Sequence, residues 1–505
     1  MSNPLLRTKS IEQSIADTDE PGRRLRRNLS AWNLVVFGVS VVIGAGIFAV
    51  AAQMAGDKAG PAISLSFVMA AVACALAALC YAEFASTVPV AGSAYTFGYA
   101  TFGEFLAWVL GWDLVLEFAV GSAVLAKAWS SYLDNVIGVS GTAAVSIGSS
   151  QLSVDWGALL VIAAMATLLA IGTRMSSLFT AVVTVIKVSV VLFFIVAGIF
   201  FIEKKNYTPF VPQSVPGDHE PGVDSTLFSL ITGGGGSAYG WYGVLAAASI
   251  VFFAFIGFDV VATTAEETRN PSRDIPRGII GSLVIVTVLY VAVSIVVTGM
   301  APYKDLKTTV NPDGTKDHKT LADAFALHGA DWAEKLVGIG ALIGLTTVVM
   351  VLLLGQIRVL FAMSRDGLIP RSASVTSARF GTPLRLTVIV AVGVALLAAV
   401  FPMDRLEEMV NVGTLFAFVV VAAGVLALRR MRPDLKRGFT VPGGPVIPVL
   451  AIVACLWLML NLTALTWIRF VAWMALGVVV YFAYSMRHSM VGRRERGELP
   501  AAGGD

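Results

Sequence analysis

The stretch Ile43-Gly44-Ala45-Gly46-Ile47 places two glycines inside a long apolar run, and Ile256-Gly257-Phe258-Asp259 interrupts a second run in the other half of the chain. A helix that breaks inside a bilayer exposes N–H and C=O groups that lipid cannot satisfy, so such breaks are tolerated only where they line a cavity. Interrupted helices in matching positions of two halves are typical of transporters. The sequence therefore predicts a transport site at these two breaks.

The composition excludes an ordinary soluble protein. The mean hydropathy is +0.79 and only 14% of the residues are charged, against about 25% in soluble domains. A bilayer-spanning helix needs ~20 mostly apolar residues. We therefore expect an all-α integral membrane protein with twelve transmembrane helices, near 31–55, 61–85, 104–137, 156–172, 177–202, 243–266, 278–300, 332–362, 384–401, 407–428, 447–466 and 468–486.

Positive charge is unevenly distributed between alternate loops. With the N-terminus inside, roughly two thirds of the 36 Lys and Arg residues fall on the inner side, as the positive-inside rule requires. Residues 1–30 contain no apolar stretch, so we expect the first span itself to direct insertion. The chain is predicted to be a multi-pass protein of the cell membrane with both termini in the cytoplasm.

The residues that would indicate other classes of protein are missing. Cys74, Cys80 and Cys455 lie in apolar runs without disulfide or metal spacing. The chain has no phosphate-binding G-x-x-x-x-G-K-[ST] motif, and its apolar runs contain no His, Cys or Ser–His constellation. We therefore expect neither an enzyme nor an ATP-driven pump, no cofactor or metal, and no nucleic-acid partner.

Several motifs occur in a fixed order from about residue 28 to 445. The two breaks and their flanks are joined by Ala59-Gly60-Pro61-Ala62, Tyr81-Ala82-Glu83, Gly111-Trp112-Asp113, Ala265-Glu266-Glu267-Thr268-Arg269-Asn270-Pro271, Met363-Ser364-Arg365-Asp366-Gly367 and Asn411-Val412-Gly413-Thr414-Leu415. In this order they resemble the cationic amino acid transporter branch of the amino acid–polyamine–organocation superfamily, in a bacterial twelve-span form. Shorter relatives of this kind include carriers of neutral amino acids.

The resemblance implies a core of five plus five helices related by an inverted repeat, spans 1–5 and 6–10, with discontinuous helices 1 and 6 and two peripheral spans. The expected organisation is a cytoplasmic tail at 1–30, the first repeat at 31–202, an extracellular loop at 203–242, the second repeat at 243–428, a cytoplasmic loop at 429–446, spans 11 and 12 at 447–486, and a cytoplasmic tail at 487–505.

Broken helices can bind an amino acid zwitterion through backbone groups alone. The half-helix beginning near Gly46 offers free N–H groups to a carboxylate, and the one ending near Ala254 leaves carbonyls for an ammonium. The alternative is that the glycines only permit close helix packing. The resemblance assigns the ammonium to carbonyls of Ile43, Phe253, Ala254 and Ile256, and the carboxylate to Gly44, Ala45, Gly46 and Ile47.

Lys187 lies deep within the fifth apolar run, where an ionisable side chain is functional by default. Burial disfavours the charged form of an amine, so this lysine could exchange a proton during transport. In related carriers, a lysine here resembles a replacement for the sodium ion that sodium-coupled cousins bind between spans 1 and 8. A permanently charged structural tether is the alternative.

Asp113 and Glu117 are spaced i,i+4 on the third span and share a face. The resemblance places Glu117 near the central cavity, where it could attract a basic side chain or pair with a lysine, and a purely structural carboxylate is the alternative. Asp259 could either extend the pocket or cap the inner half-helix.

Together these features favour a secondary active carrier of L-amino acids in the lipid bilayer, coupled to protons and working by alternating access. Two alternatives remain at this stage: an exchanger without obligatory proton coupling, and a membrane sensor that binds amino acids without transporting them.

Overall fold

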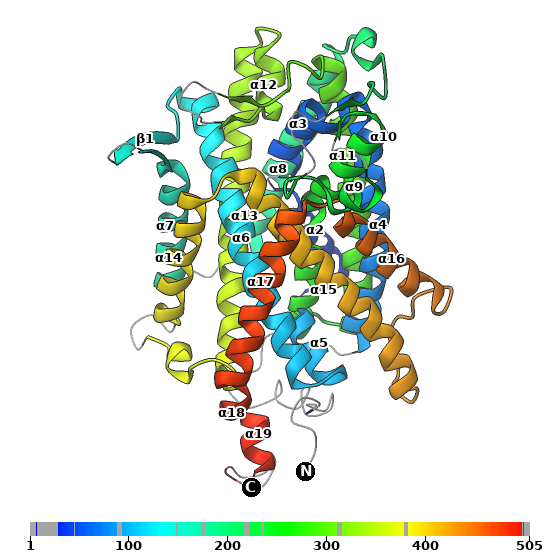
Figure 1. Ribbon diagram of the computed structural model, residues 1–505, viewed down its shortest axis with the longest axis vertical. Coiled ribbons are helices and arrows are strands. Elements are labelled where there is room, and N and C mark those ends of the chain that lie inside the picture. The colour runs from blue at the N-terminus through cyan, green and yellow to red at the C-terminus, as the bar shows by residue number, and fades with distance from the viewer. Residues whose placement is uncertain are drawn as a thin grey trace.

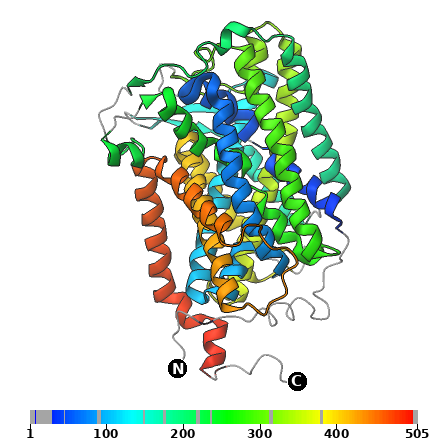
Figure 2. The ribbon, with the colours of Figure 1, turned by 90° about the vertical axis from the view of Figure 1, so that its right-hand side faces the viewer.

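The computed structural model describes residues 7, 29–44, 46–87, 93–147, 150–172, 177–216, 222–233, 237–310, 316–377, 382–496 and 498. Most of these residues are helical, and the long helices run approximately along the long axis of the molecule (Figures 1 and 2). The expected all-α class is therefore confirmed at the level of a mostly helical protein with long apolar helices.

Most residues of the first half lie in long helices. Its elements are α2 (Ala31–Val42), η2 (Gly46–Val50), α3 (Ala51–Met54), η3 (Ala55–Ala59), η4 (Gly60–Ala62), α4 (Ile63–Thr87), α5 (Ser93–Thr101), α6 (Glu104–Ile137), β1 (Thr142–Ile147), β2 (Ser150–Asp155), α7 (Trp156–Ile171) and α8 (Ser177–Ile199).

The rest of the chain consists of the connection at 203–242 and the second half. Its elements are η5 (Lys204–Tyr207), β3 (Val215–Pro216), α9 (Leu227–Thr232), β4 (Ser237–Ala238), α10 (Gly240–Val251), η6 (Phe252–Phe255), η7 (Asp259–Glu267), α11 (Pro271–Met300), β5 (Thr309–Val310), β6 (Lys316–Asp317), α12 (Leu321–Ala326), α13 (Asp331–Arg365), η8 (Arg371–Ser374), α14 (Leu384–Val400), α15 (Met403–Met431), α16 (Val446–Leu460), α17 (Ala464–Val480), η9 (Tyr481–Ser485), α18 (Met486–His488) and α19 (Met490–Glu495).

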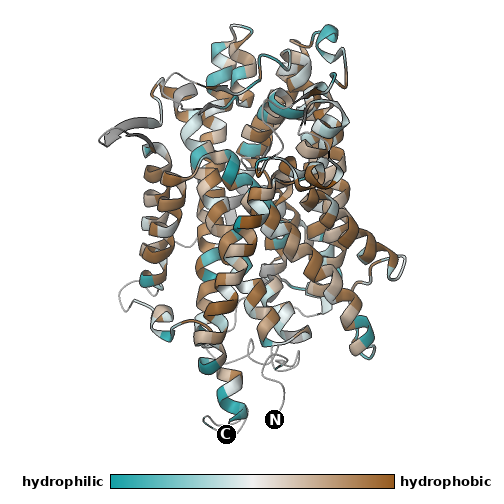
Figure 3. Cartoon of the chain, in the orientation of Figure 1, coloured by the Kyte–Doolittle hydropathy of each residue, from teal (hydrophilic) through white to brown (hydrophobic). Residues whose placement is uncertain are grey.

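Eight helical stretches among the described residues are long and apolar enough to cross a membrane. Shorter apolar helices lie at α2, α7, α14 and α16. Hydrophobic residues colour the sides of the bundle, while hydrophilic residues gather toward its two ends (Figure 3). This distribution is expected for a protein whose sides contact lipid and whose ends contact water.

The two halves of the chain are packed together and do not form separate units. The most extensive helix contacts join α6 with α13 and α4 with α11. In each pair, one helix precedes the connection at 203–242 and the other follows it, so the two halves share one core. The centre of the molecule, where α2 and α10 are interrupted, is therefore enclosed by helices from both halves.

The connections between the long helices contain short elements that the sequence interpretation did not include. β1 and β2 form an antiparallel hairpin with Thr142 opposite Asp155. The 203–242 segment, predicted as a loop, contains α9 and the paired strands β3 and β4. Such strands are too short to produce a clear periodic pattern. The three cysteines are free and buried.

Candidate functional site

The first break lies where the sequence predicts it. Helix α2 ends at Val42, Ile43 adopts an extended conformation with ψ 95°, and a π-helical turn begins at Gly46. Ala45, a predicted carboxylate-binding residue, lies outside the described residues. The chain thus leaves one helix and enters another within a few residues, and the helix ends carry backbone groups without intrahelical partners.

Three side chains from other helices bind carbonyl groups beside this break. Tyr290 of α11 donates its hydroxyl to the Val42 carbonyl at 2.7 Å. Tyr132 of α6 donates to the Phe48 carbonyl at 2.6 Å. Lys187 of α8 donates to the Ser40 carbonyl at 2.7 Å. Side chains of three other helices thus supply hydrogen-bond donors to backbone carbonyls on both sides of the break.

The second break lies where the sequence predicts it. The α-helical part of α10 ends at Val251, and a tight 3-10 turn, common at helix ends, continues the helix over Phe252–Phe255. Ile256 is extended, with φ −62° and ψ 139°, and Gly257 has a φ of +115°. A side chain would be strained at that φ, which explains the glycine.

The two breaks touch each other through their backbones. A Cβ atom placed on Gly46 would lie 2.1 Å from the Cα of Ala254, and one placed on Gly257 would lie 2.8 Å from Val41 Cγ1. At Gly44 the nearest atom would be Leu125 Cδ2, at 3.3 Å. The two segments that the sequence singled out therefore form one buried centre at the junction of the two halves.

The other predicted substrate residues lie in the same centre. All are largely buried: Ile43, Ile47 and Ala254 are at most 1% exposed, Phe253 is 6% exposed, and Ile256 is partly exposed. The Phe253 carbonyl already accepts a bond from the N–H of Ile256 at 3.2 Å. A carbonyl oxygen has a second lone pair, so this bond leaves it able to accept another donor.

Asn411 of α15 fixes the end of α10, although sequence reasoning gave it no role. Its Nδ2 donates to the carbonyls of Ser249 and Ile250 at 2.9 and 3.1 Å, while its Oδ1 has no hydrogen-bond partner among the described residues. Tyr132, Tyr290 and Asn411 were all missed as site residues. Their only signal is a polar side chain within an apolar run, and that pattern does not reveal the partner.

A group of acidic side chains borders the second break. Glu117 and Asp113 project from α6, and Asp259 begins η7; all three are 2% exposed or less. Asp113, Asp259 and the Thr414 hydroxyl all lie near the Glu117 carboxylate. The spacing of Asp113 and Glu117 therefore does place them on one face.

Several oxygen atoms in this group lack hydrogen bonds. Both carboxylate oxygens of Asp113, one of Glu117, one of Asp259 and the Tyr81 hydroxyl have no partner among the described residues. The Asp259 carboxylate also lies near the N–H groups of Gly257 and Val260, at the start of η7. Buried polar atoms are normally paired. Unpaired carboxylate oxygens at this position would suit a proton or a cationic group of a ligand.

Lys187 of α8 lies beside the first break, at the Ser40 carbonyl. Its side chain is fully buried, packs its aliphatic carbons near Gly344 of α13, and forms no ion pair with a described residue. The ammonium group is thus placed between α2 and α13, with a backbone carbonyl as its ligand. Pairing of Glu117 with a lysine, one of the possibilities raised from the sequence, is not seen among the described residues, where Lys127 and Lys205 form ion pairs with other carboxylates.

The remaining membrane-embedded lysine has a structural partner. The Lys127 Nζ lies 3.5 Å from the Asp155 carboxylate and donates to the Ala398 carbonyl at 3.0 Å. At the opposite end of the bundle, Glu83 of α4 forms a two-point ion pair with Arg429 of α15, at 2.8 and 2.5 Å. These pairs connect helices around the site rather than entering it.

Comparison with known proteins identifies the family of the chain. The family model described as amino acid permease matches residues 29–486. The chain is 40% identical to a branched-chain amino acid permease of Bacillus subtilis, over 97% of this chain and 99% of that protein. It is 37% identical to the methylthioribose transporter of the same organism, with the same coverage.

A plant relative extends the comparison to another substrate class. The chain is 37% identical to the vacuolar cationic amino acid transporter 4 of Arabidopsis thaliana, over 86% of this chain and 68% of that protein. These relatives are transporters rather than enzymes. The chain belongs to the amino acid permease family of the amino acid–polyamine–organocation superfamily.

Proposed function

We propose that this permease carries L-amino acids by alternating access and holds the α-ammonium and α-carboxylate of the substrate between its two helix breaks. The observation that carries the proposal is the direct backbone contact of Gly46 with Ala254. It brings the N–H end of one interrupted helix to the C=O end of another. Such a pair of ends matches both charges of a zwitterion.

The proposal includes twelve spans, an inverted five-plus-five core and cytoplasmic termini. In support, a helix occupies each apolar run, and the first and last described segments meet at one end of the molecule through the Arg7–Glu495 ion pair at 2.9 Å. Interrupted helices in the first and second halves are the arrangement of inverted-repeat transporters.

We further propose that Lys187 couples transport to protons. Its ammonium binds the carbonyl of Ser40, only a few residues before the first break. Loss of its proton would remove a donor from α2 and so alter the helix that holds the substrate. Residues with two protonation states at such a position can bias two conformations of a carrier.

Uptake into reconstituted vesicles tests the proposal. Purified protein should accumulate labelled leucine or arginine when an inward proton gradient is imposed, and a protonophore should abolish this accumulation. Protein-free vesicles are the control. Exchange that persists without any gradient dependence would favour the exchanger, whereas binding without uptake would favour the sensor.

Competition experiments test which substrate side chains the carrier prefers. The relatives are described as carriers of branched-chain and cationic amino acids, and as a methylthioribose transporter. The unpaired oxygens of Glu117 and Asp259 favour a substrate with a positive side chain. Unlabelled arginine and lysine should therefore compete at least as well as leucine and isoleucine, and failure of both cationic amino acids to compete would contradict this preference.

A further inference from the structure

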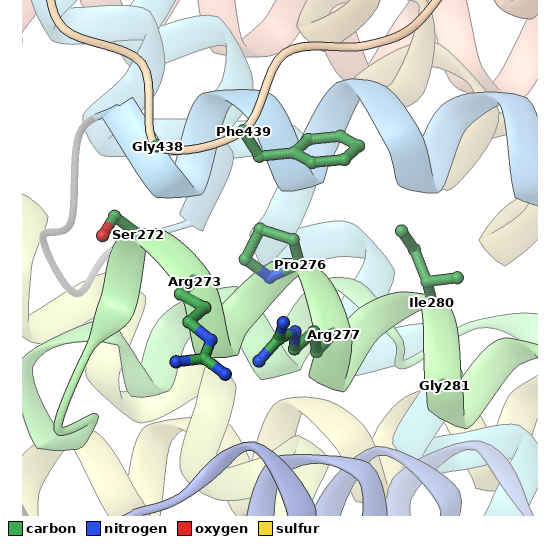
Figure 4. A pocket seen from close by; sticks show the side chains of 8 residues that line it. All are labelled: Ser272, Arg273, Pro276, Arg277, Ile280, Gly281, Gly438 and Phe439. Atoms are coloured by element: carbon green, nitrogen blue, oxygen red, sulfur yellow. The ribbon is translucent and has the colours of Figure 1, made fainter.

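A cavity of about 520 Å³ lies away from the helix breaks, at the beginning of α11. One wall consists of Arg273, Pro276, Arg277 and Ile280 of α11, and the other of Gly438 and Phe439, which belong to the segment between α15 and α16 (Figure 4). The cavity is at the same end of the bundle as the Glu83–Arg429 ion pair, which is the end proposed to be cytoplasmic.

The charge of this cavity is uncompensated. Arg273 and Arg277 are exposed, and neither forms an ion pair with a described residue. They are spaced i,i+4, so their guanidinium groups share one face of α11. No carboxylate lines the cavity among the described residues. Two adjacent guanidinium groups are suited to a phosphate group, which they can bind with several charge-assisted hydrogen bonds.

Apart from Ser272, the rest of the cavity lining is apolar, and this apolar face continues along the outside of the bundle. Pro276, Ile280 and Phe439 form its inner surface. Beyond Ile280 the same face of α11 presents Val284, Val288 and Ile295, which are 57%, 64% and 43% exposed. An α-helical stripe of this kind, in a membrane protein, faces acyl chains. The site therefore combines an anion-binding end with an apolar track.

The second wall is anchored to the bundle. The N–H of Phe439 donates to the Ser86 hydroxyl at 3.1 Å, and that of Val441 donates to the Glu83 carboxylate at 2.7 Å. Gly438 is so close to α11 that a Cβ there would lie 2.3 Å from Ser272 Cβ. The cavity thus has two fixed walls rather than a mobile cover.

We propose that this cavity binds one anionic phospholipid, with its phosphate at Arg273 and Arg277 and an acyl chain along Ile280, Val284 and Val288. Basic pockets on the cytoplasmic side of membrane proteins bind such headgroups. A soluble phosphate would use the arginines but not the apolar track. The bound lipid connects the beginning of α11, which follows η7 in the chain, with the segment anchored to α4.

Native mass spectrometry of the full-length protein tests this site, with phosphatidylglycerol and phosphatidylcholine of identical acyl chains as probes. Wild type should retain one phosphatidylglycerol at concentrations where phosphatidylcholine is not retained. R273Q/R277Q should lose that lipid, with binding at least about tenfold weaker because charged hydrogen bonds are removed. F439A should also weaken binding while leaving the charge unchanged.

The matched control is R371Q/R385Q. It removes two exposed arginines at the same end of the bundle, neither of which forms an ion pair with a described residue. It should bind phosphatidylglycerol like wild type. Size-exclusion chromatography and thermal unfolding establish that each variant is folded, and phosphatidylglycerol should raise the melting temperature of wild type but not of R273Q/R277Q.

Four results would overturn the proposal. The first is equal retention of phosphatidylglycerol by R273Q/R277Q and wild type, and the second is equal loss of this lipid in both double variants. The third is displacement of the lipid by soluble glycerol phosphate at a similar concentration. The fourth is lipid binding that occurs only after deletion of residues 2–24. The third would indicate a soluble phosphate ligand, and the fourth would indicate that the N-terminal tail occupies the cavity.

Discussion

Gly46 and Ala254 lie so close together that a Cβ on Gly46 would fall 2.1 Å from the Cα of Ala254. No side chain fits between the two backbones, whereas at Gly44 the nearest atom, Leu125 Cδ2, would lie 3.3 Å away. The two glycines of the first break therefore have different roles, although they are two residues apart in the same motif.

Gly46→Ala should separate the two breaks and destabilise the protein by about 1–3 kcal/mol, as overpacking of a core does. Gly44→Ala should lower the free energy of unfolding by less, because the end of the Leu125 side chain can move away from the added methyl group. Thermal unfolding and substrate binding measure both effects. Gly393→Ala is the control, since a Cβ there meets no atom within 4 Å. Equal effects at Gly44 and Gly46 would contradict the direct contact.

Lys187→Met should abolish accumulation driven by a proton gradient but preserve exchange of substrate between the two sides of the vesicle. Methionine retains most of the side-chain volume and removes the donor to Ser40. Lys187→Arg should also lose accumulation, because arginine cannot release its proton. Lys127→Met is the control, since Lys127 pairs with Asp155. If Lys187→Met still concentrates substrate under a proton gradient, Lys187 is a structural tether.

Glu117→Gln and Asp259→Asn should weaken transport of arginine and lysine more than that of leucine or alanine. Loss of a charged hydrogen bond to the substrate corresponds to about tenfold or more in affinity. Competition against a labelled neutral amino acid measures the selectivity. Equal losses for all substrates would assign these carboxylates a structural role, and for Asp259 that role would be the cap beside Gly257 and Val260.

Glu83→Gln should destabilise the protein strongly, by about 3–5 kcal/mol, because it leaves a largely buried arginine without its charge partner. Glu83 is 3% exposed, and it also accepts the N–H of Val441. Thermal unfolding measures the loss. Glu495→Gln is the matched control: it removes the more exposed Arg7–Glu495 pair and should change stability by less than about 1 kcal/mol. Similar losses in both variants would show that burial does not determine the strength of the Glu83 pair.

The sequence alone determined the class of the protein, the positions of the apolar helices and the places where two of them break. These properties are local: an apolar run is helical in a bilayer because its backbone must bond to itself, and glycines at 44, 46 and 257 permit the interruption. The same local character allowed Glu117 and Asp113 to be placed on one face, and Lys187 to be recognised as unusual.

The partners at the site were decided only by the tertiary structure. Tyr290 meets Val42, Lys187 meets Ser40 and Asn411 meets Ser249, pairs separated by 248, 147 and 162 residues in the chain. Such contacts depend on the rotation and depth of each helix in the bundle. Apolar residues all round these helices leave that rotation unspecified in the sequence, so it is set by side-chain packing between the two halves.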